Sequence, residues 1–429
     1  MAVPLFNLAR QRIKTPSLHE AMRQGALRVL DHQEFILGRE VLSFEQEVEH
    51  ACLESTLLGS EVCALHASHE KPHAIGVSSG TDGLLALLIA SDIGPGDAVI
   101  TTPYTFFATA GCIHRVGAEI IFCDIDPMTY MMDPEKLEIL LSSFQRDQEG
   151  VLKSPNGNRV KMIIPIHLFG TCCDMDAILS IAQEYGLLVI EDAAQVLGAD
   201  YPSMHGPKKA GAIAKMSYFS FYPTKNLGAA GDAGLAVTLD PKVAQRLRVI
   251  RNHGMEERYY HQIVGGNFRL DAMQAAILRV RLPFLEEWNA GRRANAALYK
   301  KAFVQANLLD YIVLPYEPWA ASGLKNHHIF HQYVVRIVGS AQNGPRAGLR
   351  EKIMTHFTQH EIGHAIYYPV PLHLQECFAY LGYEQGDFPE SERAAQETLA
   401  LPIFPELYPE EINSVVDVIK EAIKDESSS

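Results

Sequence analysis

The sequence contains neither a long apolar run nor a cluster of basic residues. No stretch approaches the roughly 20 consecutive apolar residues that a membrane-spanning helix needs. The N-terminal MAVPLFNLARQRIK also lacks the apolar core of a secretory signal. The formal net charge is −14 and no lysine- or arginine-rich run is present, which argues against binding to nucleic acid or to an anionic membrane. We therefore expect a cytoplasmic protein with no nucleic-acid or membrane partner.

Two further classes are disfavoured by what is missing. The seven cysteines are odd in number, and Cys172 and Cys173 are adjacent, so reduced thiols are expected rather than a disulfide framework. No Gly-Lys-Ser/Thr follows the turn SSGTDG (78–83), so this turn is not a P-loop. No GxGxxG opens a helix after the first strand, which weakens a nicotinamide-binding interpretation.

Short apolar strands alternating with helices dominate the first half of the chain. Of the 429 residues, 47 % are hydrophobic, enough for a large core. Near-continuous apolar strands alternating with helices predict a mostly parallel sheet covered on both faces, and so an α/β, three-layer αβα domain. The expected strands are 73–77, 98–102, 118–125, 160–166 and 187–193, and the helices between them are 84–91, 134–146 and 174–185.

The remaining segments predict a second, smaller unit. Residues 17–53 are expected to be helical with a break near 36–38, and 241–253 and 269–306 are also expected to be helical. Beyond them we expect strands near 328–338 and 364–368 and helices near 346–361, 391–400 and 409–424. The predicted domains are 1–285, with an N-terminal helical arm, and 286–429, a small C-terminal α+β domain. Residues 58–73 and 145–159 are polar and turn-rich, as surface insertions are.

One lysine stands out, in MSYFSFYPTKNLGAAGDAGLAV (216–237). A short aromatic strand leads into Ser220, and Lys225 follows five residues later. Gly228, Gly231 and Gly234 then allow a tight return into another strand. A lysine held in such a turn suits imine formation with a carbonyl compound, above all pyridoxal phosphate (PLP). The same residues also fit a hairpin in which the lysine is exposed to solvent.

Two other motifs are expected at strand ends, where ligands bind in open α/β sheets. SSGTDG places Gly80, Thr81 and Asp82 at a helix N-terminus, which favours a phosphate, although an ordinary capped turn also explains it. EDAAQ (191–195) ends a strand with Asp192, which either pairs with a protonated pyridine nitrogen or caps a helix. Gln195 would then reach the hydroxyl of the same ring.

Aromatic and histidine motifs leave further alternatives. In PYTFFATA (103–110), Phe106 or Phe107 either stacks on a cofactor ring or belongs to the core. HEIGH (360–364) fits the HExxH zinc pattern, but Gly363 is expected to end the helix and leave His364 outside it. HHIFH (327–331) alternates like a strand, and its histidines are interpreted as surface or pocket residues. We therefore expect no metal site.

The motifs together, in the order GTDG, TFFAT, EDAAQ and SFYPTKNLG, resemble the sugar aminotransferases of the DegT/DnrJ/StrS type. These enzymes are a branch of the PLP-dependent transferases of fold type I. The resemblance extends from PLFNLARQ and FILGREV through RNHG, GGNFRLDAMQAAIL and IYYPVPLH to LPIFPEL. Two motifs depart from it, because GTCC (170–173) replaces Gly-Gln-Pro and GGN replaces Gly-aromatic-Asn.

The resemblance implies a role for each matched residue. Lys225 forms a Schiff base with PLP, Asp192 pairs with the ring nitrogen, and Gln195 contacts the ring oxygen. Phe106 stacks on the ring. The residues implied to hold the phosphate are Gly80, Thr81, Asp82 and Ser220.

The resemblance also implies a homodimer with composite active sites. Asn267, in GGNFRLD, matches the residue that the partner subunit lends to the phosphate. Tyr222, Tyr367 and Tyr368 match positions near the sugar.

The implied reaction moves an amino group from L-glutamate to a keto-sugar of a nucleotide diphosphate. IYYPVPLH with SFYPTKNLG is more similar to members that aminate C3 than to members that aminate C4. A PLP-dependent sugar dehydratase is one alternative, although such enzymes carry histidine where Lys225 stands. A non-catalytic sugar-sensing or regulatory protein is another, although it would more often have lost Lys225 or Asp192.

Overall fold

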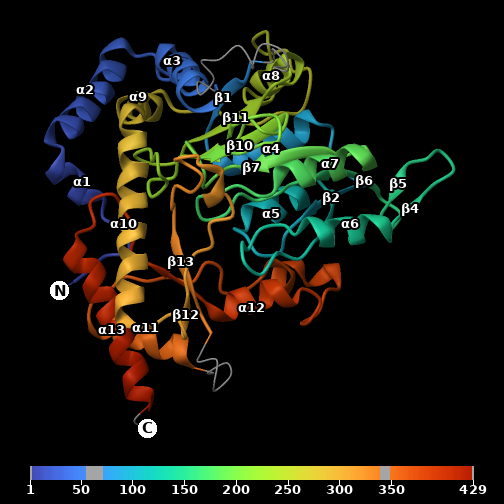
Figure 1. Ribbon diagram of the computed structural model, residues 1–429. Helices are drawn as coiled ribbons and strands as arrows, with labels where there is room; N and C mark the ends of the chain where they lie inside the picture. The colour runs from blue at the N-terminus through green and yellow to red at the C-terminus, as the bar shows by residue number, and fades with distance from the viewer. Residues whose placement is uncertain (1, 55–70, 339–347, 428–429) are drawn as a thin grey trace.

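The computed structural model describes residues 2–54, 71–338 and 348–427 (Figure 1). Most of the predicted insertion 58–73 therefore lies outside the described residues. The other insertion, 145–159, contains two short paired strands, β4 (Gln145–Arg146) and β5 (Leu152–Lys153), and projects away from the sheet at the start of β6 (Arg159–Ile163) (Figure 1). Within the described ranges, no helix is both long and apolar enough to cross a membrane.

The centre of the molecule is a mostly parallel sheet with helices packed on it (Figure 1). The strand order is β1-β11-β10-β7-β6-β2-β3; the pairs from β10 to β3 are parallel, and β11 is antiparallel to both of its neighbours. The predicted mostly parallel α/β architecture is thus confirmed. The strands are β1 (His73–Val77), β2 (Asp97–Thr101), β3 (Glu119–Phe122), β6 (Arg159–Ile163), β7 (Leu188–Asp192), β10 (Met216–Ser220) and β11 (Gly234–Thr238).

The helices around this sheet begin where the sequence supplies caps. Asp133 and Asp240 accept backbone hydrogen bonds at the starts of α6 and α8, and each is followed by proline at the first helical position. Gly186 ends α7 in the left-handed conformation. These helices are α4 (Gly80–Ala90), α5 (Ala108–Arg115), α6 (Pro134–Ser142), α7 (Met175–Tyr185) and α8 (Pro241–Ile250).

The N-terminal helices protect one edge of the sheet. They are α1 (Leu8–Lys14), α2 (Pro16–His32) and α3 (Arg39–Val48), with one π-helical turn at Glu49–Leu53. Strand β1 is an edge strand, and its free N–H groups at Ala74 and Gly76 donate to the carboxylates of Glu49 and Glu45 at 2.8 and 2.7 Å. Arg251 compensates the buried charge of Glu45. The edge therefore has no free donors there for another strand to pair with.

The C-terminal part forms a second hydrophobic core. A three-stranded sheet, ordered β12-β13-β14, lies beside the long helix α10, which packs on α13 (Figure 1). The N-terminal segment joins this core, since Val3 is buried in it and pairs with Ile362. The long elements from residue 272 onward, of which α9 packs on α2 and α3, are α9 (Ala272–Arg281), α10 (Leu285–Ala306), β12 (Ile312–Val313), β13 (Tyr333–Ile337), α11 (Leu349–Gln359), α12 (Pro389–Glu397), β14 (Thr398–Leu401) and α13 (Pro409–Ser427). The division at 285/286 stays a prediction.

Short elements complete the chain. They are the two-stranded pair β8 (Asp200–Tyr201) and β9 (Lys208–Lys209), and the 3₁₀ turns Leu282–Phe284, Ala320–Ser322, Leu372–Leu374 and Glu376–Leu381. The first of these turns, which contains Pro283, divides the single helix predicted over 269–306.

Three sequence expectations were wrong in the C-terminal part. Residues 364–368 form no strand, because only an isolated bridge joins Ala365 to Ala400. The helix predicted to 400 ends at Glu397, and the apolar Thr398–Leu401 continues as a strand paired with β13. The helix before HEIGH ends at Gln359, and Glu361, not Gly363, takes the left-handed conformation. His364 lies outside the helix, as expected.

Candidate active site

Lys225 and Asp192 face each other across neighbouring strand ends. Asp192 is the last residue of β7, and in the parallel register it lies beside Tyr218 of β10. Lys225 lies in the turn after β10, where its backbone N–H donates to the Tyr222 carbonyl at 2.8 Å. Burial lowers the pKa of Lys225 to about 8, and the nearby Asp192 carboxylate opposes that shift. The predicted pair of amine and carboxylate is thus brought together.

Asp192 is buried and receives only neutral donors. The Thr109 hydroxyl donates to Oδ2 at 3.1 Å, the Ala194 N–H donates to Oδ1 at 3.1 Å, and the Tyr218 hydroxyl adds a third bond. Burial raises the pKa of Asp192 in spite of these bonds. A buried carboxylate in this state gains most from a nearby cation. Thr109 and Tyr218 were missed by the sequence analysis, although both lie within the motifs that it quoted.

A second buried carboxylate fixes the end of β7. Glu191 accepts hydrogen bonds from three backbone N–H groups of residues 211–214 at 2.6 to 2.9 Å, and from His167 Nε2 at 2.9 Å. His167 Nδ1 accepts from the Cys173 N–H, so the proton must lie on Nε2. The backbone N–H of His167 also donates to the backbone carbonyl of Asp192 at 3.0 Å. The position of Asp192 is therefore held from both neighbouring loops.

The predicted phosphate residues come together at the start of α4. Gly80 lies against Ser220, since a Cβ on Gly80 would stand 2.9 Å from the Ser220 Cβ. A Cβ on Gly234 would stand 2.3 Å from the Ser79 carbonyl carbon, so only glycine allows β11 to pass so close to the helix start. The backbone N–H groups there and the helix dipole favour an anion.

Asp82 takes part in the cap of α4, and its predicted contact with a phosphate stays a prediction. Its carboxylate accepts from the hydroxyls of Ser78 and Ser79 at 2.6 and 3.0 Å, and its N–H donates to Ser79 Oγ. Both the carboxylate and the backbone N–H of Asp82 therefore take part in the cap of the helix. Ser79 acts as the N-cap and was missed, although it lies within the quoted motif SSGTDG.

Gln195 and the aromatic residues line the open side. Gln195 Oε1 accepts from the Phe169 N–H at 2.7 Å, which turns its Nε2 toward Tyr368 Oη at 3.2 Å. The Phe106 side chain is 60 % exposed and its ring centroid lies 6.4 Å from that of Tyr368. Phe106 is therefore not a core aromatic, whereas Phe107 stacks on Phe378.

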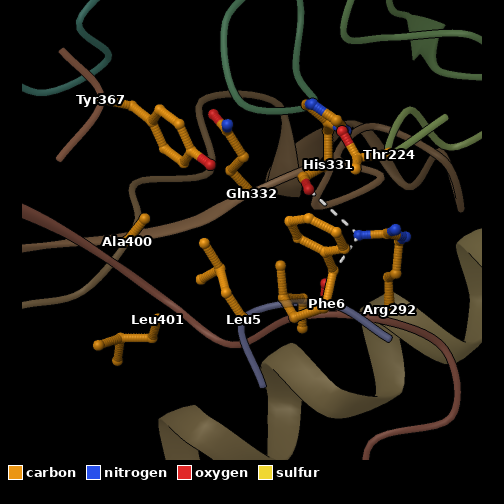
Figure 2. Close-up of a pocket in the computed structure, with 10 residues that line it drawn as sticks. Leu5, Phe6, Thr224, Arg292, His331, Gln332, Tyr367, Ala400 and Leu401 are labelled. Atoms are coloured by element: carbon orange, nitrogen blue, oxygen red, sulfur yellow. Dashed lines mark hydrogen bonds between the residues drawn. The ribbon is translucent and has the colours of Figure 1, made fainter. Parts of the chain in front are cut away.

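Three predicted residues are less closely connected. The Tyr222 side chain is 53 % exposed. Tyr367 lines a small cavity next to Thr224 (Figure 2). Asn267 is exposed, and no recorded hydrogen bond in the described part of the chain joins its side chain to Lys225 or Ser220. Among the described residues, no group of three or more His, Cys, Asp or Glu is placed to hold a metal ion.

The comparison with known families decides what this arrangement is. A model of the DegT/DnrJ/EryC1/StrS aminotransferase family matches residues 16–420. The chain belongs to this family. The predicted resemblance is therefore confirmed, as are the sheet architecture of fold type I and the assignment of the chain to a family of enzymes.

Relatives within the DegT/DnrJ/EryC1/StrS family cover the chain almost completely. One from Geobacillus stearothermophilus, named a pleiotropic regulatory protein, is 40 % identical over 98 % of both chains. One from Acidithiobacillus ferrooxidans, named a UDP-N-acetyl-3-dehydro-alpha-D-glucosamine 3-aminotransferase, is 36 % identical, again over 98 % of both. The solved structure of NtdA from Bacillus subtilis, described as having bound cofactor PMP (pyridoxamine phosphate), is 28 % identical with a TM-score of 0.78, covering 99 % of this chain and 85 % of that one.

Proposed function

We propose that this protein transfers an amino group from L-glutamate to a keto-sugar of a nucleotide diphosphate, with PLP as cofactor, in amino-sugar biosynthesis. The observation that carries the proposal is the pair of Lys225 and Asp192 at neighbouring strand ends, next to the helix start at Gly80. Family membership supports an aminotransferase. The name of the A. ferrooxidans relative supports amination at C3 rather than C4.

The residues present fit PLP at four points. The buried Asp192 carboxylate gains from a nearby cation, and a protonated ring nitrogen supplies one. The helix start beside Gly80 and Ser220 suits the phosphate, and the Gln195 Nε2 is turned to donate to the ring oxygen. The exposed Phe106 ring is free to stack on the cofactor.

The chain's own residues then have defined tasks. Bound PLP supplies an electron sink for the negative charge that remains when the donor's α-carbon loses its proton. Lys225 binds the cofactor, and its amine, with a pKa of about 8, can both take up and release a proton near neutral pH. Asp192 keeps the ring nitrogen protonated. Glutamate leaves as 2-oxoglutarate, and its amino group passes to the sugar carbonyl carbon.

The substrate is tested with a matched panel. The PLP-loaded protein is incubated with L-glutamate and with UDP- or dTDP-linked sugars that carry the keto group at C3 or at C4, and products are identified by mass spectrometry. We expect an amino-sugar from a 3-keto compound together with one equivalent of 2-oxoglutarate. Amination of the 4-keto compounds alone would contradict the C3 assignment, and no amination of any sugar would contradict the activity.

We also propose a homodimer in the cytoplasm whose active sites are shared between subunits. Asn267 is exposed and unconnected to the site of its own chain, as expected for a residue that serves the partner subunit. Mixing inactive K225A with N267A tests the idea, because a mixed dimer then contains one site with both changes and one without either. Recovered activity supports sharing, whereas activity no higher than that of N267A places Asn267 in its own site.

A regulatory role is the second candidate, favoured by the name of the G. stearothermophilus relative. A protein that only senses sugars has no need of Lys225 and Asp192 together, and both are present and close enough to influence each other's charge. The substrate panel separates the two functions, since a sensor binds a nucleotide sugar and leaves it unchanged.

A further inference from the structure

The histidine motif HHIFH is not used by the proposed function, yet most of it is buried. His327 pairs with Glu317 at 3.0 Å, while the His328 and His331 side chains are 2 % and 8 % exposed. His331 bonds to the turn that carries Lys225, because its Nδ1 lies 2.8 Å from the Oδ1 of Asn226. The interpretation of the motif as surface or pocket residues is therefore incomplete.

A directed chain of hydrogen bonds reaches His331 from a backbone carbonyl. Asn289 Nδ2 donates to the Leu197 carbonyl at 3.3 Å, and a carbonyl can only accept, so the orientation of this amide is fixed. Asn289 Oδ1 then accepts from Asn226 Nδ2 at 2.6 Å. Asn226 must therefore present its Oδ1 to His331, and His331 carries its proton on Nδ1.

The surroundings of His331 keep its ring neutral. Burial lowers the pKa of His331 well below its ordinary value, and the charges of Lys225 and Arg292 lower it further. Arg292, on α10, donates to the carbonyls of His331 and Ile403 at 3.1 and 3.0 Å and so fixes the backbone that carries the ring (Figure 2). His331 and Thr224, the residue before Lys225, line the same cavity of about 40 Å³ (Figure 2).

We propose that His331 is a positioning residue for Lys225, which it holds in place through the buried side chain of Asn226. The hydrogen-bonded chain joins four separate segments: the loop after β7, helix α10, the lysine turn and the segment before β13. Asn226 is only 6 % exposed, so the residue next to Lys225 is anchored inside the protein. This inference rests on the proposed role of Lys225.

The position of Lys225 has a measurable consequence. Burial lowers the pKa of Lys225 to about 8, and the Asp192 carboxylate opposes that shift. The nearby His331 ring is neutral. If the turn loses its anchor, water reaches the amine and its pKa rises toward that of an ordinary lysine. Only the unprotonated amine reacts with PLP, so a higher pKa slows covalent capture of PLP below pH 8 and leaves capture at high pH intact.

The chain offers a matched set of variants. In H331N the amide nitrogen takes the place of Nδ1 and keeps the bond to Asn226. H331Q places its amide near the position of Nε2 instead. H331A has no nitrogen at either position. H328N is the control, because His328 is equally buried and Nδ1 accepts from the Phe330 N–H rather than contacting Asn226.

The experiment measures how fast the cofactor-free protein captures PLP at Lys225 between pH 6 and pH 10. Capture is quantified by borohydride reduction and peptide mass spectrometry, with thermal unfolding recorded in parallel. We expect H331A and H331Q to raise the apparent pKa of Lys225 by about one unit, which slows capture at pH 7 about tenfold. H331N should stay near the wild type, and H328N should lower the melting temperature without moving the pKa.

Two results would overturn the proposal: an H331N shift as large as that of H331Q, or no shift in either variant. These two variants retain an amide and decide the point even where H331A does not fold. A wild-type protein that captures no PLP at Lys225 would instead overturn the proposed function, so the two failures are distinguishable.

Coupling between the two side chains gives an independent check. If His331 acts through Asn226, N226A produces the same shift as H331A, and the double variant adds nothing to either single change. Additive shifts would show that His331 acts on Lys225 by another route and would overturn the proposal.

Discussion

The two sides of the candidate site are built from different parts of the chain. On the lysine side, Lys225, Asp192 and the start of α4 all stand at the ends of strands of one sheet. On the opposite side, Tyr367, Gln332 and Phe6 come from loops of the C-terminal part and from the N-terminal segment, and they meet around a small cavity (Figure 2). The lysine side is held by strand pairing, whereas the opposite side is held by individual side-chain contacts.

This difference suggests a division of labour. The lysine side contains a buried carboxylate and a lysine of lowered pKa, which are the features that the transfer chemistry needs. The opposite side presents exposed or half-buried aromatic residues and amides, which are suited to recognising a sugar. Changes on the first side should therefore affect the rate of the chemistry, and changes on the second side should affect which substrate binds.

The largest effect is expected from Lys225. K225A removes the amine that binds PLP and moves the proton, so kcat should fall by about 10³-fold or more. The measurement is 2-oxoglutarate release under saturating glutamate and sugar. K215A, which removes an exposed lysine just before β10, is the control and should retain full activity. Residual activity of K225A above a tenth of the wild type would contradict the assignment of Lys225.

A smaller but still large effect is expected from Asp192. D192N retains an oxygen for the Ala194 N–H but loses the charge that keeps the ring nitrogen protonated, so kcat should fall about 10²-fold. The control is D174N, which makes the same change at the N-cap of α7. Because Asn caps a helix about as well as Asp, D174N should change stability little and leave kcat unchanged. Equal activities of the two variants would remove Asp192 from the chemistry.

The glycine contacts at the start of α4 should affect cofactor binding. G234A places a Cβ against the Ser79 backbone, which costs about 2 kcal/mol through displacement of the helix start. We expect PLP affinity to fall more than tenfold, as measured by titration of the cofactor-free protein. G94A is the control, because the nearest atom to its added Cβ is 3.7 Å away. Unchanged affinity in G234A would place the phosphate elsewhere.

The smallest effects are expected from two tyrosines, Tyr368 on the opposite side and Tyr222 in the lysine turn. Y368F removes the hydroxyl that accepts from Gln195 Nε2, worth about 1 kcal/mol, so a change of about fivefold in kcat/KM for the sugar is expected. Y222F removes the hydroxyl of an exposed ring with no recorded partner in the described chain and should change kcat/KM less. Steady-state kinetics with the preferred nucleotide sugar measures both, and a larger effect for Y222F would reverse their assigned importance.

The same contrast explains what the sequence could predict. Lys225, Asp192 and Gly80 lie in short continuous motifs at strand ends, so the strand pattern alone was enough to bring them together. The bonds from Asn289 through Asn226 to His331 join residues that are far apart in the chain, and no local pattern indicates them. Residues 398–400 were assigned to a helix because a short apolar run fits either period, and only pairing with β13 decides the matter.

The central claim is that Lys225 carries the cofactor for amino transfer, and one spectroscopic experiment tests it most directly. The protein is reconstituted with PLP, its visible absorbance is recorded, and a borohydride-reduced sample is mapped by peptide mass spectrometry. We predict that PLP is attached at Lys225, that L-glutamate abolishes the visible absorbance, and that a 3-keto nucleotide sugar restores it. Attachment at another lysine, or a visible absorbance that glutamate leaves unchanged, would contradict the account.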